Sequence, residues 1–105
     1  MGFFGSGGGP RASAMTAAAV EAAVFTQTRF REGYDLEEVD AFLARCAASI
    51  RWAEGGSRPS DPVTADDVVA ARFRPTKFRA GYDQNQVDDL LDRIVVTLRT
   101  EPRRA

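Results

Sequence analysis

Apolar residues recur at helical spacing in two stretches of the chain, with polar residues at most positions between them. Intervals of three, four and seven residues place them on one helix face, a pattern typical of an amphipathic helix that packs on a partner. Asp35 and Asp83 precede the two stretches, and Glu38 and Gln86 follow three residues later, which predicts capping-box-like starts for two long helices. We expect their apolar faces to pair through Val39, Phe42, Leu43, Cys46 and Ile50 of one helix and Val87, Leu90, Leu91, Ile94 and Leu98 of the other.

A short helix is predicted ahead of each long one. Thr64 is a favourable N-cap residue, and Asp66 and Asp67 place negative charge in the first turn, where the helix dipole favours it. The two short helices are expected to end near Phe25 and Phe73, whose rings we assign to the core.

The segments between the short and the long helices, Thr26–Gly33 and Arg74–Gly81, are rich in arginine and end in glycine. The second also contains Pro75. Because glycine and proline interrupt regular structure, both segments are predicted to be irregular loops.

The chain contains an internal duplication. A shift of 48 residues places Thr16–Arg51 over Thr64–Arg99 without a gap, and about half of the aligned residues are identical. Residues 15–51 therefore form a first repeat and residues 63–100 a second repeat, joined by a linker at 52–62. A glycine-rich tail at 1–14, expected to be disordered, and a short tail at 101–105 flank them. These features predict an all-α protein whose two helix–loop–helix repeats pair as a small helical bundle or short coiled coil.

The sequence leaves the geometry of this pairing open. A linker of about ten residues spans about 16–19 Å as a flexible coil and about 33 Å when extended. That reach permits either parallel or antiparallel helices. We expect the repeats to pair within one chain as a pseudo-dimer, and pairing between two chains would instead give a homodimer.

Composition removes most enzymatic chemistry. The chain has 14 basic and 15 acidic residues, no histidine and one cysteine, so the commonest general base and any thiolate cluster are absent. Cys46 lies on an apolar stripe and is interpreted as a small buried hydrophobic residue. We expect no enzymatic activity, no cofactor and no metal, and the net charge of −1 predicts no nucleic-acid partner. The absence of any run of about 20 apolar residues predicts a cytoplasmic protein.

The motif F-x₄-F-R-x-G-Y-D-x₃-V-D-x₂-L occurs once in each repeat, beginning at Phe25 and at Phe73. Together with the segment Val63-Thr64-Ala65-Asp66-Asp67-Val68 ahead of the second copy, it resembles the DivIVA-domain family of bacterial cell-division and polar-growth proteins. The repeats cover about two thirds of the chain. The excess of arginine over lysine, thirteen to one, is typical of GC-rich bacteria such as actinobacteria.

The resemblance implies a membrane-associated scaffold in which a loop presents an aromatic side chain and an arginine to lipid. It also implies an anionic surface at the inner face of the membrane and other DivIVA-type or division proteins as partners. An adaptor that binds a coiled-coil or divisome partner without touching lipid is the alternative. The sequence does not decide whether Phe30 and Phe78 face lipid or the core. The candidate lipid- or partner-binding residues are Arg29, Phe30, Arg31, Lys77, Phe78 and Arg79.

Family members continue the second helix of the domain into a long coiled coil. Here both long helices are predicted to stop, one at Gly55-Gly56 and the other at Pro102. The helical stripes are therefore expected to pair only over a short length.

Overall fold

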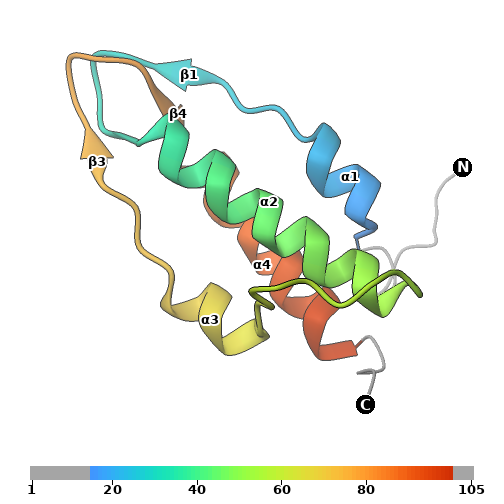
Figure 1. The fold of residues 1–105 in the computed structure, drawn as a ribbon. Helices are drawn as coiled ribbons and strands as arrows, with labels where there is room; N and C mark the ends of the chain where they lie inside the picture. The colour runs from blue at the N-terminus through green and yellow to red at the C-terminus, as the bar shows by residue number, and fades with distance from the viewer. Residues whose placement is uncertain (1–14, 101–105) are drawn as a thin grey trace, which may run out of the picture.

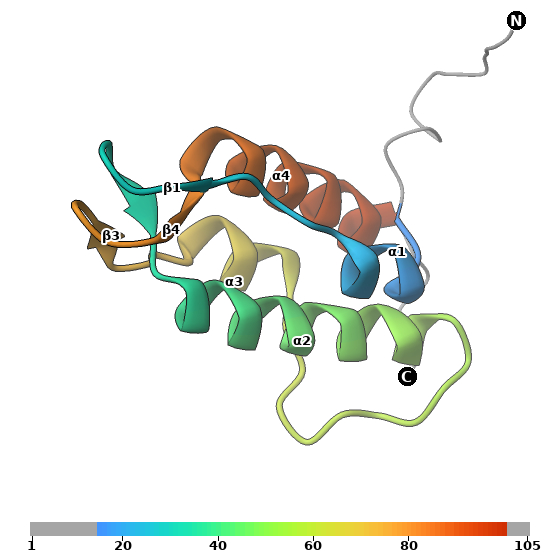
Figure 2. The same ribbon diagram turned by 90° about the horizontal axis from the view of Figure 1, so that it is seen from above.

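Two long helices, α2 (Leu36–Ala53) and α4 (Gln84–Thr100), lie side by side and run in the same direction (Figure 1, Figure 2). A short helix accompanies each of them: α1 (Ala17–Ala22) packs against α2, and α3 (Ala65–Ala70) packs against α4. The computed structural model describes residues 15–100, so the tails expected at 1–14 and 101–105 lie outside the described residues.

Aspartate side chains cap both long helices. The Asp35 carboxylate accepts a hydrogen bond from the backbone amide of Glu38 at 3.0 Å, and Asp83 accepts one from the amide of Gln86 at 3.0 Å. Each bond satisfies one of the amides that a first helical turn leaves without a backbone partner.

Both short helices end earlier than expected. Ala23 and Ala71 follow their last residues and adopt extended backbone, with ψ of 138° and 141°. The chain therefore leaves each helix before Phe25 or Phe73, and those rings lie against aromatic residues of the other repeat.

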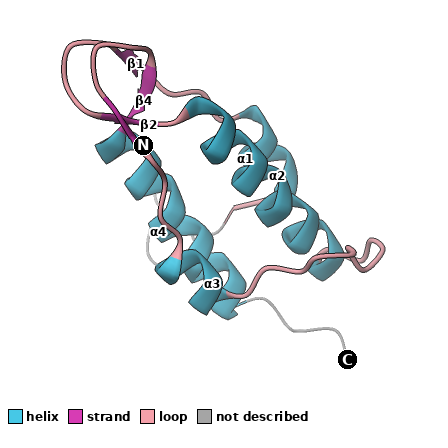
Figure 3. Ribbon diagram, turned by 60° about the vertical axis from the view of Figure 1, so that its left-hand side comes forward, coloured by secondary structure: helices cyan, strands magenta, loops and turns pink. Residues whose placement is uncertain are grey.

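The two segments predicted to be irregular loops instead form a four-stranded antiparallel sheet (Figure 3). Its strands are β1 (Gln27–Thr28), β2 (Gly33–Tyr34), β3 (Pro75–Thr76) and β4 (Gly81–Asp83), in the order β1-β4-β2-β3. The expectation of an all-α protein is therefore wrong. The fold is mixed, with a small sheet at the end of the helix pair where α2 and α4 begin (Figure 1).

Every strand pairing in this sheet joins one repeat to the other. β1 pairs with β4, β2 pairs with β3, and the central strands β2 and β4 pair with each other. Strands of two or three residues are too short for alternating polarity to reveal them. Their partners are also remote in sequence, since Tyr34 faces Pro75. Tertiary pairing, not local pattern, makes these segments extended.

Gly33 and Gly81 let the strands approach closely. A Cβ added to Gly81 would lie 1.9 Å from Oγ1 of Thr76, and one added to Gly33 would lie 2.8 Å from the carbonyl oxygen of Tyr82. A side chain at either position would push the strands apart.

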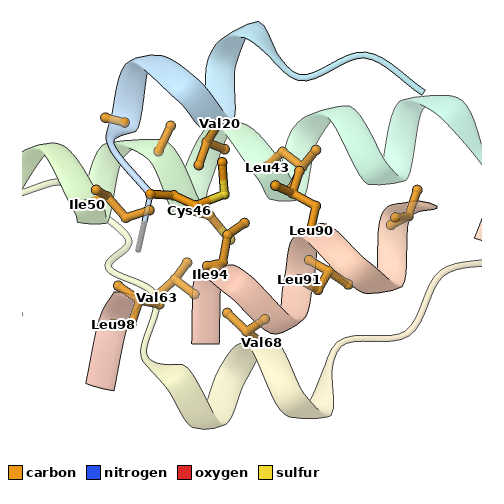
Figure 4. Packing of buried hydrophobic residues seen from close by; sticks show 14 of the residues in the cluster. Val20, Leu43, Cys46, Ile50, Val63, Val68, Leu90, Leu91, Ile94 and Leu98 are labelled. Carbon is orange, nitrogen blue, oxygen red and sulfur yellow. The ribbon is translucent and has the colours of Figure 1, made fainter. Parts of the chain in front are cut away.

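The core lies between α2 and α4 and is closed from the sides by α1 and α3 (Figure 4). Of the ten residues expected on the pairing stripes, nine are buried, and Phe42 is partly buried with its ring 5.8 Å from that of Phe73. Val20 of α1 and Val68 of α3 pack into the same cluster. One continuous core therefore serves both repeats.

The repeats pair within one chain, and the long helices are parallel. The Met15 amide donates a hydrogen bond to Thr97 Oγ1 on α4 at 2.7 Å, and the Val63 amide donates one to Ser49 Oγ on α2 at 2.7 Å. Met15 and Val63 occupy equivalent positions in the two repeats, as do Ser49 and Thr97. The two bonds therefore form a reciprocal pair that anchors the start of each short helix to the other repeat.

The connector between the repeats begins later than expected, because α2 continues through Trp52 and Ala53. Trp52 is partly buried, and the Arg58 guanidinium lies 5.4 Å from its ring centroid. Arg45 on α2 forms an ion pair with Asp61 at 2.9 Å. These contacts hold the connector against the outer face of α2.

Candidate functional site

The six candidate binding residues lie in two loops at the same end of the molecule, beyond the sheet (Figure 1). We call residues 29–32 the first tip and residues 77–80 the second tip. The Phe78 amide donates a hydrogen bond to the Arg29 carbonyl oxygen at 2.7 Å. The structure therefore brings the two tips into direct contact.

The two tip phenylalanines are exposed. Phe30 has 79% of its surface open to solvent and Phe78 has 72%, although phenylalanine is usually sheltered in a core. Phe78 has a φ of 64°, a left-handed conformation that is rare for a bulky residue. The second tip therefore holds its aromatic residue outward at a conformational cost.

Basic residues flank both phenylalanines in the sequence. Arg29 and Lys77, at equivalent positions, are exposed, and Lys77 Nζ lies 5.6 Å from the Phe78 ring centroid. Arg31 and Arg79 pair with the aspartates that cap the long helices of the other repeat. The two tips together contain four basic residues and one acidic residue, Glu32.

The base of the site is built from two reciprocal tyrosine contacts. The Tyr34 hydroxyl donates a hydrogen bond to Asp88 at 2.9 Å, and the Tyr82 hydroxyl donates one to Asp40 at 2.8 Å. Burial raises the pKa of both tyrosines above the ordinary value of 10.0, and the hydrogen bond to the carboxylate raises it further. Each tyrosine thus ties the root of one tip to the long helix of the other repeat.

Aromatic stacking repeats this arrangement. The ring of Phe25 lies 5.2 Å from that of Tyr82, and the ring of Phe73 lies 5.3 Å from that of Tyr34, both tilted. These distances fall within the range of favourable aromatic pairs.

Sequence reasoning did not identify the tyrosine–aspartate pairs. A signal was present, because the spacing from tyrosine to aspartate is the same in both repeats and all four residues are identical between them. In this chain these two aligned identities belong to contacts that cross between the repeats.

Two equivalent pockets lie beside the short helices. The pocket next to α3 has a volume of about 520 Å³ and is lined by Val69, Arg72, Phe73 and Val95 among others. The pocket next to α1 is smaller, about 270 Å³, and includes Val20, Phe25 and Leu43. Both are open to solvent along one side and are lined by mixed apolar and charged residues.

Within residues 15–100 no group of three or more histidine, cysteine, aspartate or glutamate side chains is arranged to hold a metal ion. Cys46 is fully buried, and burial raises the pKa of its thiol to about 12, so it is not a reactive nucleophile. No helix in the described part of the chain is long and apolar enough to cross a membrane.

Comparison of the chain with protein-family models, curated proteins and solved structures found no match.

Proposed function

We propose that this protein is a non-catalytic scaffold or adaptor that attaches to an anionic membrane surface through its two tips. The observation that carries the proposal is the exposure of Phe30 and Phe78 next to each other at one end of the molecule. The DivIVA-like motif supports the same role and suggests a process, cell division or polar growth, at the cytoplasmic face of a bacterial membrane.

The energetics favour binding by both tips together. Burial of a phenylalanine side chain contributes about 2 kcal/mol, and each basic residue near an anionic leaflet adds about 1 kcal/mol. One tip alone would bind weakly. Because the sheet joins both tips, the second engages at a high effective concentration once the first has bound.

The tips are also pre-organised. The strand pairings, the bond from Phe78 to Arg29 and the tyrosine contacts hold both loops before any partner arrives. Binding therefore loses little conformational entropy in ordering the site.

Flotation with vesicles tests this proposal. Wild-type protein is expected to float with phosphatidylglycerol-containing vesicles and not with phosphatidylcholine vesicles. Replacing both rings, in Phe30→Ala/Phe78→Ala, is expected to weaken binding about a thousandfold. The matched control is Val24→Ala/Val69→Ala, which removes exposed apolar groups away from the tips and should bind as wild type does.

Two results would contradict the membrane role: no flotation of the wild type, or equal loss in both double variants after circular dichroism shows that both are folded. The alternative function, a protein adaptor that binds without lipid, is favoured by the pocket of about 520 Å³ next to α3, whose rim includes the exposed Val69. In that case Val69→Asp would abolish binding to the partner, and the tip variants would not.

A further inference from the structure

The four basic residues of the tips are not in equivalent surroundings. Arg31 lies 2.5 Å from the Asp83 carboxylate, and Arg79 lies 3.4 Å from that of Asp35. Arg29 and Lys77 form no ion pair with any residue in the described part of the chain. The tips therefore contain two compensated and two uncompensated positive charges.

The aspartates in these ion pairs are the sheltered partners. The side chains of Asp83 and Asp35 are only 11% and 16% exposed, whereas those of the arginines are mostly open to solvent. Each aspartate also caps a long helix. An arginine that turned away to a phosphate group would leave a largely buried carboxylate without its cation, which is unfavourable.

The compensated pairs also cross between the repeats. Arg31 of the first tip contacts the cap of α4, and Arg79 of the second tip contacts the cap of α2. Each pair therefore fixes a tip against the long helix of the other repeat. A neutral pair gives little net attraction to an anionic surface, so its contribution is to orient the tip.

The uncompensated residues are placed differently. Arg29 and Lys77 each stand immediately before a tip phenylalanine, and both are exposed. Lys77 lies over the Phe78 ring, and the Arg29 carbonyl oxygen accepts the bond from the Phe78 amide. Their charges are thus close to the rings that would enter the membrane interface.

We infer that Arg29 and Lys77 bind the phosphate groups of anionic lipid, while Arg31 and Arg79 are positioning residues that hold the tips. This assignment rests on the proposed membrane function. It deepens that function by separating the residues that recognise the anionic surface from those that shape the loop.

Three variants of the full chain test the assignment by vesicle titration and thermal unfolding. Arg29→Gln/Lys77→Gln removes the uncompensated charges. Arg31→Gln/Asp83→Asn together with Arg79→Gln/Asp35→Asn neutralises both ion pairs without changing the net charge, and asparagine retains the ability to cap a helix. Arg93→Gln/Arg99→Gln, on α4, lowers the net charge by the same amount as the first variant, away from the tips.

Arg29→Gln/Lys77→Gln is expected to weaken binding to phosphatidylglycerol vesicles about thirtyfold with an unchanged melting temperature. The charge control should bind within about threefold of wild type. The pair-neutral variant should melt at a lower temperature and, when folded, also bind within about threefold. If all four of its substitutions prevent folding, Arg31→Gln/Asp83→Asn alone serves the same purpose.

The assignment is overturned if a folded pair-neutral variant loses binding as Arg29→Gln/Lys77→Gln does, or if the latter binds normally while wild type floats. Wild-type protein that floats with no vesicle overturns the membrane function itself, and this assignment with it. Soluble glycerol phosphate distinguishes the source of the phosphate group: millimolar amounts should leave vesicle binding intact, and displacement at that concentration would show that a small phosphate ester is the ligand.

Discussion

The first and the second repeat meet through the same contacts taken in opposite directions, but they differ in the contacts that each makes within itself. Tyr34 binds Asp88 at 2.9 Å and Tyr82 binds Asp40 at 2.8 Å, so the crossing bonds are almost the same length. The geometry of the crossing contacts is kept even where the residues differ, as in the bonds to Thr97 and Ser49. Some local features, in contrast, have diverged between the repeats.

The helix starts illustrate the divergence. α3 begins with a complete capping box, in which Thr64 and Asp67 each bind the other's backbone amide. At the start of α1, Thr16 accepts a bond from the Ala19 amide, but alanine returns none. The tips diverge as well: the second holds Phe78 at a φ of 64° and has no acid, whereas the first contains Glu32.

The largest expected effect concerns the close approach of the strands. Gly33→Ala and Gly81→Ala should each destabilise the protein by about 3 kcal/mol, because a Cβ at either site meets packed atoms. The obstacle differs: at Gly81 it is the Thr76 hydroxyl, whose oxygen is buried and has no hydrogen-bond partner among residues 15–100, and at Gly33 it is backbone.

Adding Thr76→Ala to Gly81→Ala should therefore recover about half of the lost stability in urea denaturation. Adding Thr28→Ala to Gly33→Ala should recover little, because the Tyr82 carbonyl oxygen remains 2.8 Å away. Equal recovery of stability in both double variants would contradict the assignment of a side-chain obstacle at Gly81 and a backbone obstacle at Gly33.

The second-largest expected difference between the repeats concerns the N-caps of the two short helices. Thr64→Ala is expected to lower the free energy of unfolding by about 1.5 kcal/mol and Thr16→Ala by about 0.5 kcal/mol, since only the former disrupts a capping box. Chemical denaturation at pH 7 measures both values. A larger loss from Thr16→Ala would show that the reciprocal bond of Asp67 has no effect on stability.

Acidic pH should reduce the difference in unfolding free energy between Thr64→Ala and Thr16→Ala. The hydrogen bonds from Thr64 lower the pKa of Asp67 below its usual 3.8. The ionised carboxylate therefore stabilises the fold above the unfolded-state pKa, and this contribution is lost as the pH falls through the lower folded-state pKa. The two alanine variants should converge in stability below pH 4.

The two tyrosine contacts, which cross between the repeats, should contribute equally to stability. Tyr34→Phe and Tyr82→Phe should each cost about 1 kcal/mol, within about 0.5 kcal/mol of one another. Because the folded-state pKa of each tyrosine is raised above 10.0, its contribution is complete below pH 10 and is lost as the pH rises through the folded-state pKa. Above pH 10 the stability of wild type should fall more steeply than that of the double phenylalanine variant.

The smallest expected effect distinguishes the tips. At position 78 glycine should be more stable than alanine by about 0.5 kcal/mol, because the left-handed backbone favours a residue without Cβ. At position 30 alanine should be more stable than glycine by a similar amount, because glycine has more freedom in the unfolded chain. Thermal unfolding of the four single variants checks the sign at each position.

The long helices were accessible from the sequence because each has an aspartate cap and a stripe of several turns, and both signals are local. The sheet was not, because a pair such as Gly33-Tyr34 carries no periodicity and becomes a strand only against residues more than 40 positions away. The tip phenylalanines were undecided for a related reason. Phe25 and Phe30 are both phenylalanines in similar sequence contexts, and only the sheet makes Phe25 partly buried and Phe30 exposed.

The strand pairings also bear on how the protein is made. Each pairing joins residues 41 to 55 positions apart, between Tyr34 and Pro75 at the nearest and Gln27 and Tyr82 at the farthest. Contacts this distant in sequence form slowly compared with helices, so closure of the sheet is expected to limit the folding rate. A nascent chain that ends before the second repeat contains Phe30 but none of the strands that pair with β1 and β2. The paired tips therefore form only after both repeats have been synthesised. One repeat alone cannot provide one tip of the site.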